Sequence, residues 1–270
     1  MKYAIVKAGA LALLGLFLAS AGWAQQAPTL NQPKPGQAPK NGAKGPVVTK
    51  DENNAYKALY NARTGDPAHV NELGEAFVVK FPMSVYIGPV YAMLTNSYLK
   101  TDQTDKMIDA GNKALAIDPD DVDVLPILAW AIPRRVAGNS PELPKAQGYA
   151  HHALELIAAL EKPKEMSDDD FTKSKNQMIA MAHDGLGVAA MKTGKYDDAI
   201  TELTQAIQLS EEPDPVDNYL LGMADENTNH FTDAIANFTK CAANGPMQAQ
   251  CKGLIDDTKK KSANSLEAPK

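Results

Sequence analysis

The feature that most constrains the fold is an internal sequence repeat in the C-terminal half of the chain. The stretch "KYDDAITELTQAIQL" at 195–209 is followed 35 residues later by "HFTDAIANFTKCAAN" at 230–244. Each copy carries Asp-Ala-Ile, at 198–200 and 233–235, with an aromatic residue three positions before its alanine. A repeat of this length is typical of folds built by stacking one supersecondary unit on the next.

Small residues at fixed offsets define the unit. Leu186-Gly187 and Leu221-Gly222 precede the two alanines by the same interval, and Ala206 and Cys241 follow them by seven residues. The spacing predicts two short helices joined by a tight turn at Gly194 or Asn229. The small residues let the helices approach closely, and bulky side chains fill the remaining space; these are Leu186, Leu203, Leu221 and Phe238.

These residues resemble the tetratricopeptide repeat, a helix-turn-helix unit of about 34 residues. One unit matches at Leu186, Gly187, Tyr196, Ala199 and Ala206, and the next at Leu221, Gly222, Phe231, Ala234 and Pro246. The resemblance implies an all-α fold, a right-handed superhelical solenoid of helical hairpins closed by a C-terminal capping helix. We expect hairpins at 51–83, 85–119, 122–161, 168–211 and 215–245, and a cap helix at 247–261.

The ends of the chain differ from this body. The first 24 residues carry Lys2 and Lys7, then an apolar run and small residues before Ala24, a pattern that indicates a cleaved signal peptide. A retained membrane anchor is the alternative. Residues 25–50 are rich in Pro, Gly and Lys and predict a disordered linker, and residues 262–270 predict a disordered tail. The chain is therefore expected to be exported, either periplasmic or secreted, with no stable membrane span after cleavage.

Charge and motifs limit the function classes. After loss of the leader, 25 basic residues face 33 acidic ones, a net charge of −8, which disfavours nucleic-acid binding. The pattern Ser97-x-x-Lys100 and the triplet Lys192-Thr193-Gly194 occur in penicillin-interacting enzymes, but here they lie where helices are expected, so we attribute them to coincidence. No histidine pair has metal-binding helical spacing. We predict no catalytic residue, metal or cofactor.

The resemblance also implies a binding surface, because the first helix of each hairpin lines the concave face in this family. The corresponding positions form a mixed groove with an apolar, methionine-containing floor, for which Trp130 and Tyr219 are candidate anchors. For each position the alternative is core packing against the next hairpin. The predicted groove residues are Met93, Asn96, Ile127, Trp130, Arg134, Met181, Asp184, Val188, Tyr219 and Met223.

The two cysteines, Cys241 and Cys251, flank the turn "NGP" at 244–246 almost symmetrically. An antiparallel hairpin would bring them face to face, and an even cysteine count in an exported chain favours a disulfide. The alternative is that Cys241 is only the small packing residue that its repeat position requires.

The sequence thus predicts a non-enzymatic scaffold that binds a protein or peptide partner of the cell envelope, in assembly or export. Its oligomeric state stays open. Two alternatives depend on the longer connection at 133–175: an envelope enzyme, with Ser140, Ser167 or Ser174 as candidate nucleophile, or a structural protein associated with peptidoglycan.

Overall fold

The computed structural model describes residues 48–243 and 247–267. The predicted signal peptide, most of the predicted linker and the last three residues lie outside the described part. Eleven α-helices and no strand make up the described regular structure. The helices are α1 Lys50–Ala62, α2 Pro67–Lys80, α3 Ile87–Lys100, α4 Thr104–Ile117, α5 Leu125–Arg135, α6 Glu142–Ala158, α7 Asp168–Lys192, α8 Tyr196–Leu209, α9 Pro215–Asn227, α10 Phe231–Cys241 and α11 Gln248–Glu267.

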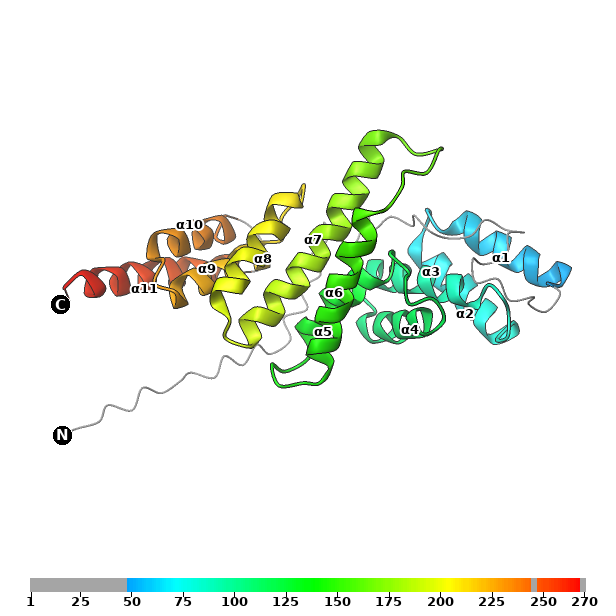
Figure 1. The fold of residues 1–270 in the computed structure, drawn as a ribbon, viewed down its shortest axis with the longest axis horizontal. Coiled ribbons are helices and arrows are strands. Elements are labelled where there is room, and N and C mark those ends of the chain that lie inside the picture. Colours follow the sequence, from blue (N-terminus) through cyan, green and yellow to red (C-terminus); the bar gives the residue numbers. More distant parts are fainter. Residues whose placement is uncertain (1–47, 244–246, 268–270) are drawn as a thin grey trace.

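The first ten helices pair in chain order into five antiparallel hairpins, and α11 packs against α10 at the end. Figure 1 shows the hairpins side by side in an elongated stack, with α1 and α2 at one end and α11 at the other. The predicted all-α solenoid of helical hairpins is therefore confirmed. The two helices of each hairpin pack on each other and on the neighbouring hairpins, as expected for stacked repeats.

Three of the hairpin turns use the same local chemistry. Asp102, Gly194 and Asn229 have φ values of 56°, 73° and 64°, and each follows a threonine. That left-handed conformation favours Gly and tolerates Asn and Asp. In each turn the threonine hydroxyl donates to the carbonyl four residues earlier, at 2.9, 2.9 and 3.1 Å. The predicted turn positions at Gly194 and Asn229 are confirmed, and Asp102 adds a third.

Two other helices begin at an Asp-Pro pair. The side chains of Asp66 and Asp214 accept the backbone N–H groups of Ala68 and Val216, at 3.0 and 2.9 Å. Proline as the first helical residue costs little, because that position lacks an intrahelical hydrogen bond in any case.

Glycines mark where helices come closest. A Cβ on Gly187 would lie 2.6 Å from Leu203 Cγ, and a Cβ on Gly222 would lie 2.7 Å from the Phe238 ring. The strongest case joins two hairpins, since a Cβ on Gly185 of α7 would lie 2.2 Å from the backbone oxygen of Ala129 on α5. The small residues named from the sequence therefore do allow close helix packing.

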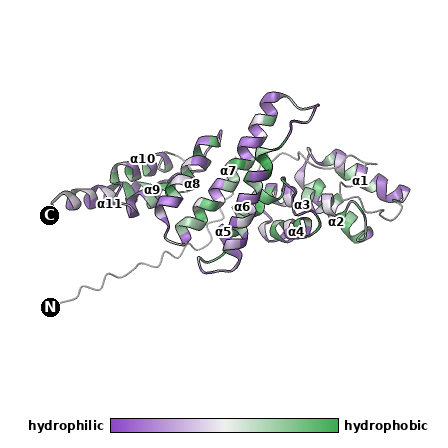
Figure 2. Cartoon of the chain, viewed as in Figure 1, coloured by the Kyte–Doolittle hydropathy of each residue, from purple (hydrophilic) through white to green (hydrophobic). Residues whose placement is uncertain are grey.

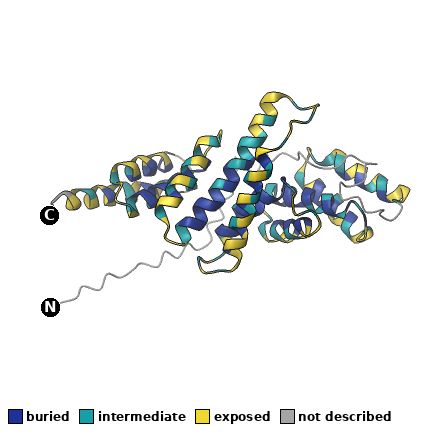
Figure 3. Cartoon of the chain, viewed as in Figure 1, coloured by how far each residue is buried: buried dark blue, intermediate teal, exposed yellow. Residues whose placement is uncertain are grey.

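The core forms three clusters that follow each other along the stack. Figures 2 and 3 show apolar and buried residues along the middle of the stack, and exposed polar residues on its margins. Helix α7 contributes to all three clusters, through Met181, then Ala182 and Leu186, then Val188. It is the element that ties the two ends of the molecule together.

Two helices extend beyond a plain hairpin. The N-terminal end of α7, with its connection from α6, rises above the neighbouring helices (Figure 1). At the other end, α11 is helical to Glu267, so the tail predicted from residue 262 begins too early. The residues just before position 262 attach this helix to the stack. Thr258 and Lys261 both bind Glu226 of α9, at 2.7 and 2.6 Å. Among residues 48–243 and 247–267, no helix has the length and apolarity to cross a membrane.

Candidate functional site

The predicted groove residues lie on α3, α5, α7 and α9, the first helices of four consecutive hairpins. The structure brings two of them into direct contact. Arg134, near the end of α5, donates to Asp184 on α7 at 2.6 Å. The same guanidinium nitrogen lies 3.5 Å from Asp217 on α9, so one cation bridges three hairpins.

Both carboxylates of this cluster are buried. The side chains of Asp184 and Asp217 are 1% and 0% exposed, and Arg134 is 15% exposed. Arg134 is held in place by its other contacts: it donates to the Trp130 carbonyl at 3.1 Å and its guanidinium lies 4.7 Å from the centre of the Trp130 ring. Trp130 is half-buried, and it packs against the Arg134 guanidinium instead of being free to contact a partner.

With both aspartates ionised, the cluster of two carboxylates and one guanidinium carries a net negative charge. Burial raises the pKa of Asp217 well above its ordinary value, and the neighbouring Asp184 carboxylate raises it further. Arg134 opposes this effect. One oxygen of each aspartate, Asp184 Oδ1 and Asp217 Oδ2, is buried without a hydrogen-bond partner. Asp217 was not among the residues predicted from the sequence. It could have been found because α5, α7 and α9, the first helices of successive hairpins, carry opposite charges at Arg134, Asp184 and Asp217.

The apolar part of the predicted groove is mostly core. Ile127, Met181 and Val188 are only 2 to 3% exposed, because adjacent hairpins cover them. They stabilise the stack, so for these three positions the structure favours core packing, the alternative to a place on the groove floor.

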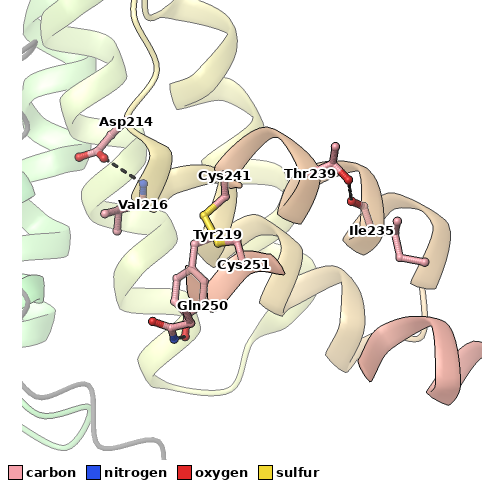
Figure 4. The surroundings of a disulfide bond; sticks show 8 residues. All are labelled: Asp214, Val216, Tyr219, Ile235, Thr239, Cys241, Gln250 and Cys251. Atoms are coloured by element: carbon pink, nitrogen blue, oxygen red, sulfur yellow. Dashed lines mark hydrogen bonds between the residues drawn. A yellow bond between two sulfur atoms is a disulfide. The ribbon is translucent and has the colours of Figure 1, made fainter. Parts of the chain in front are cut away.

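The C-terminal part is covered by α11. Tyr219 is 7% exposed, and its hydroxyl accepts a hydrogen bond from Gln250 of α11 at 3.2 Å. Figure 4 shows Tyr219 and Gln250 beside the disulfide that joins α10 to α11. Met223 is half-buried in the same cluster. Tyr219 therefore belongs to the interface with the capping helix.

The N-terminal part does offer an accessible feature. A pocket between the α1–α2 turn and α3 includes two predicted groove residues, Met93 and Asn96, which are themselves only 2% and 4% exposed. It also contains two cations, Arg63 and Lys100. Burial lowers the pKa of Lys100, and within the described part of the chain no carboxylate counters that effect. The full lining is Arg63, Gly65, Pro67, Val70, Met93, Asn96, Ser97 and Lys100.

Comparison with known proteins gives one family match, at residues 180–213, to the model described as tetratricopeptide repeat. This range holds the C-terminal half of α7, the turn at Gly194 and all of α8. Residues 180–213 therefore form a tetratricopeptide repeat. No curated protein matches the chain.

Among solved structures, the chain is similar to TTC0263, a thermophilic tetratricopeptide-repeat protein of Thermus thermophilus. The two are 18% identical with a TM-score of 0.40, and the match covers 77% of this chain and 98% of that one.

The matched range shows which part of α7 is additional. The tetratricopeptide repeat begins at Ala180, so the first twelve residues of α7, from Asp168, precede it. Ser167 caps this extension by accepting the Asp170 N–H at 3.1 Å. The projecting N-terminal end of α7 thus lies outside the matched repeat.

Residues 133–175 span α6 and the connections on either side of it. Two of the serines considered there as nucleophiles accept backbone hydrogen bonds at helix starts. Ser140 accepts the Glu142 N–H at 3.2 Å near the start of α6, and Ser167 caps α7. His152 lies 2.7 Å from Asp120 on the preceding loop. Within 48–243 and 247–267, no group of three or more metal-binding side chains gathers.

The disulfide between Cys241 and Cys251 is present, with a Cα–Cα distance of 6.0 Å (Figure 4). Both cysteines are fully buried. The packing role of Cys241 and the disulfide therefore coexist, and the bond fixes the capping helix to the last repeat. The tetratricopeptide repeat at 180–213 indicates a role in protein–protein interaction.

Proposed function

We propose that this protein is exported and acts as a non-enzymatic scaffold in the cell envelope, where it binds a protein or peptide through the N-terminal part of the stack. The cationic pocket between α1–α2 and α3 carries this proposal. The residues predicted for the groove are mostly buried, Met93 and Asn96 included, whereas Arg63 and Lys100 in the lining of this pocket are partly exposed.

The pocket favours an acidic contact on the partner. Lys100 is half-buried, and a buried ammonium group is stabilised by an anion that replaces its lost hydration. The partner is thus expected to present a carboxylate at this point.

Export is supported by two independent features. The first 24 residues have the charge and apolar pattern of a signal peptide. The only two cysteines of the chain form a disulfide, which is typical of oxidising compartments.

The test is affinity purification of the full chain from the envelope fraction, comparing wild type with Lys100→Glu and Lys57→Glu. Lys57 is exposed on α1 and is not among the pocket residues, so it controls for the charge change. We expect wild type and Lys57→Glu to retain the same partner, and Lys100→Glu to lose most of it while keeping wild-type helicity. Equal recovery by all three would place binding elsewhere, and absence of the protein from the envelope fraction would refute the proposed location.

A further inference from the structure

The Arg134 cluster joins three hairpins through groups whose charges do not balance. Arg134 comes from α5, Asp184 from α7 and Asp217 from α9. Both aspartates are fully buried, and both have an oxygen without a hydrogen-bond partner. A buried carboxylate oxygen without a donor is costly, and two in one cluster call for a common explanation.

A single proton on this pair of aspartates supplies a hydrogen-bond donor for the two unpaired oxygens and balances the charge of the cluster. If one of the two carboxyls is protonated, its hydroxyl can donate to the other aspartate, and the three groups together become neutral. Asp184 keeps the shorter bond to Arg134, 2.6 Å against 3.5 Å for Asp217. The proton therefore belongs on Asp217, and Asp184 remains the charged partner of Arg134.

We infer that Asp184 and Asp217 share one proton, and that this proton holds the junction of α5, α7 and α9 closed. Loss of the proton to solvent leaves two buried negative charges on one guanidinium and loosens the contact between α9 and the rest of the stack. The junction is thus a pH-sensitive device within the solenoid, independent of the partner-binding pocket near α1.

Few other charges act on this junction. Asp214, at the start of α9, adds a negative charge that favours protonation of Asp217. Lys192 of α7 lies near enough to Arg134 for the two positive groups to interact, and donates to the Val136 carbonyl at 2.6 Å. Arg134 is the positive group with the strongest opposing effect on Asp217.

The direction of the pH effect follows from linkage. A carboxyl whose pKa is higher in the folded than in the unfolded chain binds more protons when folded. Its stabilising contribution is complete below the ordinary aspartate pKa of about 4 and is lost as the pH rises toward the raised value. The junction is therefore expected to weaken on the alkaline side.

Two isosteric substitutions separate the roles of the aspartates. Asp217→Asn keeps a donor facing Asp184 but cannot ionise, so the mutant should lose the pH dependence that this site gives the wild type. Asp184→Asn removes the charged partner of Arg134 and should destabilise the protein at every pH. Asp198→Asn, on the exposed start of α8, controls for the change in net charge.

The experiment is urea unfolding of the full chain from about pH 5 to about pH 9. We expect the midpoint of Asp217→Asn to rise relative to wild type as the pH increases, while Asp198→Asn keeps a constant offset. A constant difference between Asp217→Asn and wild type would overturn the inference. If a variant does not fold, carboxyl-carbon NMR of wild type decides: the assigned Asp217 signal should titrate far above the ordinary range, and titration of Asp217 near about pH 4 would refute the inference.

Discussion

At the residue scale, close backbone contact rather than side-chain chemistry explains several positions. Gly185 of α7 lies against the backbone of Ala129 on α5, where a Cβ would come within 2.2 Å of the carbonyl oxygen. Neither backbone can move without disturbing the core around it, because both residues lie inside buried helices. The glycine is required by the approach of two consecutive hairpins.

We predict that Gly185→Ala destabilises the protein by about 3 kcal/mol, the upper part of the range for overpacking. Gly148→Ala is the matched control, because a Cβ added at Gly148 in α6 would meet no atom within 4 Å. That substitution should stabilise the protein by about 0.5–1 kcal/mol through helix propensity. Urea unfolding measures both, and equal effects would show that α5 and α7 are less closely packed than described.

Local residue patterns were sufficient to predict the turns and the tight packing. Gly194 and Asn229 mark the turns because left-handed residues are few and recognisable, and Gly187 and Gly222 follow the repeat. The Arg134 cluster was not predictable in the same way. Its partners lie 50 and 83 residues away, so the pairing depends on how successive hairpins align.

At the element scale, the capping helix α11 completes the stack. It is attached by the disulfide, and Gln250, Thr258 and Lys261 bind Tyr219 and Glu226 on α9. Its exposed face is polar, as a terminal element of a solenoid requires. The sequence predicted this helix, but not that it would cover Tyr219, because coverage depends on the angle at which α11 crosses α9.

Removal of the disulfide should loosen this end of the molecule. We predict that Cys241→Ala together with Cys251→Ala costs about 2–3 kcal/mol, as expected for a cross-link that closes a short loop. The bond spans only ten residues, so its effect should be local to α10 and α11. Hydrogen exchange should become faster in α11 while α3 and α4 are unchanged; unchanged exchange in α11 would mean that packing alone holds it.

At the scale of the whole molecule, most of the inward-facing side chains hold the hairpins together. The core clusters and the Arg134 junction hold the hairpins in line, and most residues predicted to form a groove belong to this support. The accessible pocket lies near the N-terminal end, with Lys100 as its half-buried cation. Repeat spacing could predict the solenoid but not this division, because exposure on the inner side depends on the curvature of the stack.

If the partner binds at the Lys100 pocket, a probe in the lining of that pocket must contact it. The most direct measurement is photo-crosslinking in living cells, with a photoreactive residue at position 65, an exposed position of the pocket lining that leaves Arg63 and Lys100 in place, and, separately, at position 113. Lys113 is exposed on α4, which pairs with the helix that carries Lys100, and it is not among the pocket residues. We predict one defined crosslinked product from position 65 and none from position 113; the same products from both, or none from position 65, would show that the partner binds elsewhere.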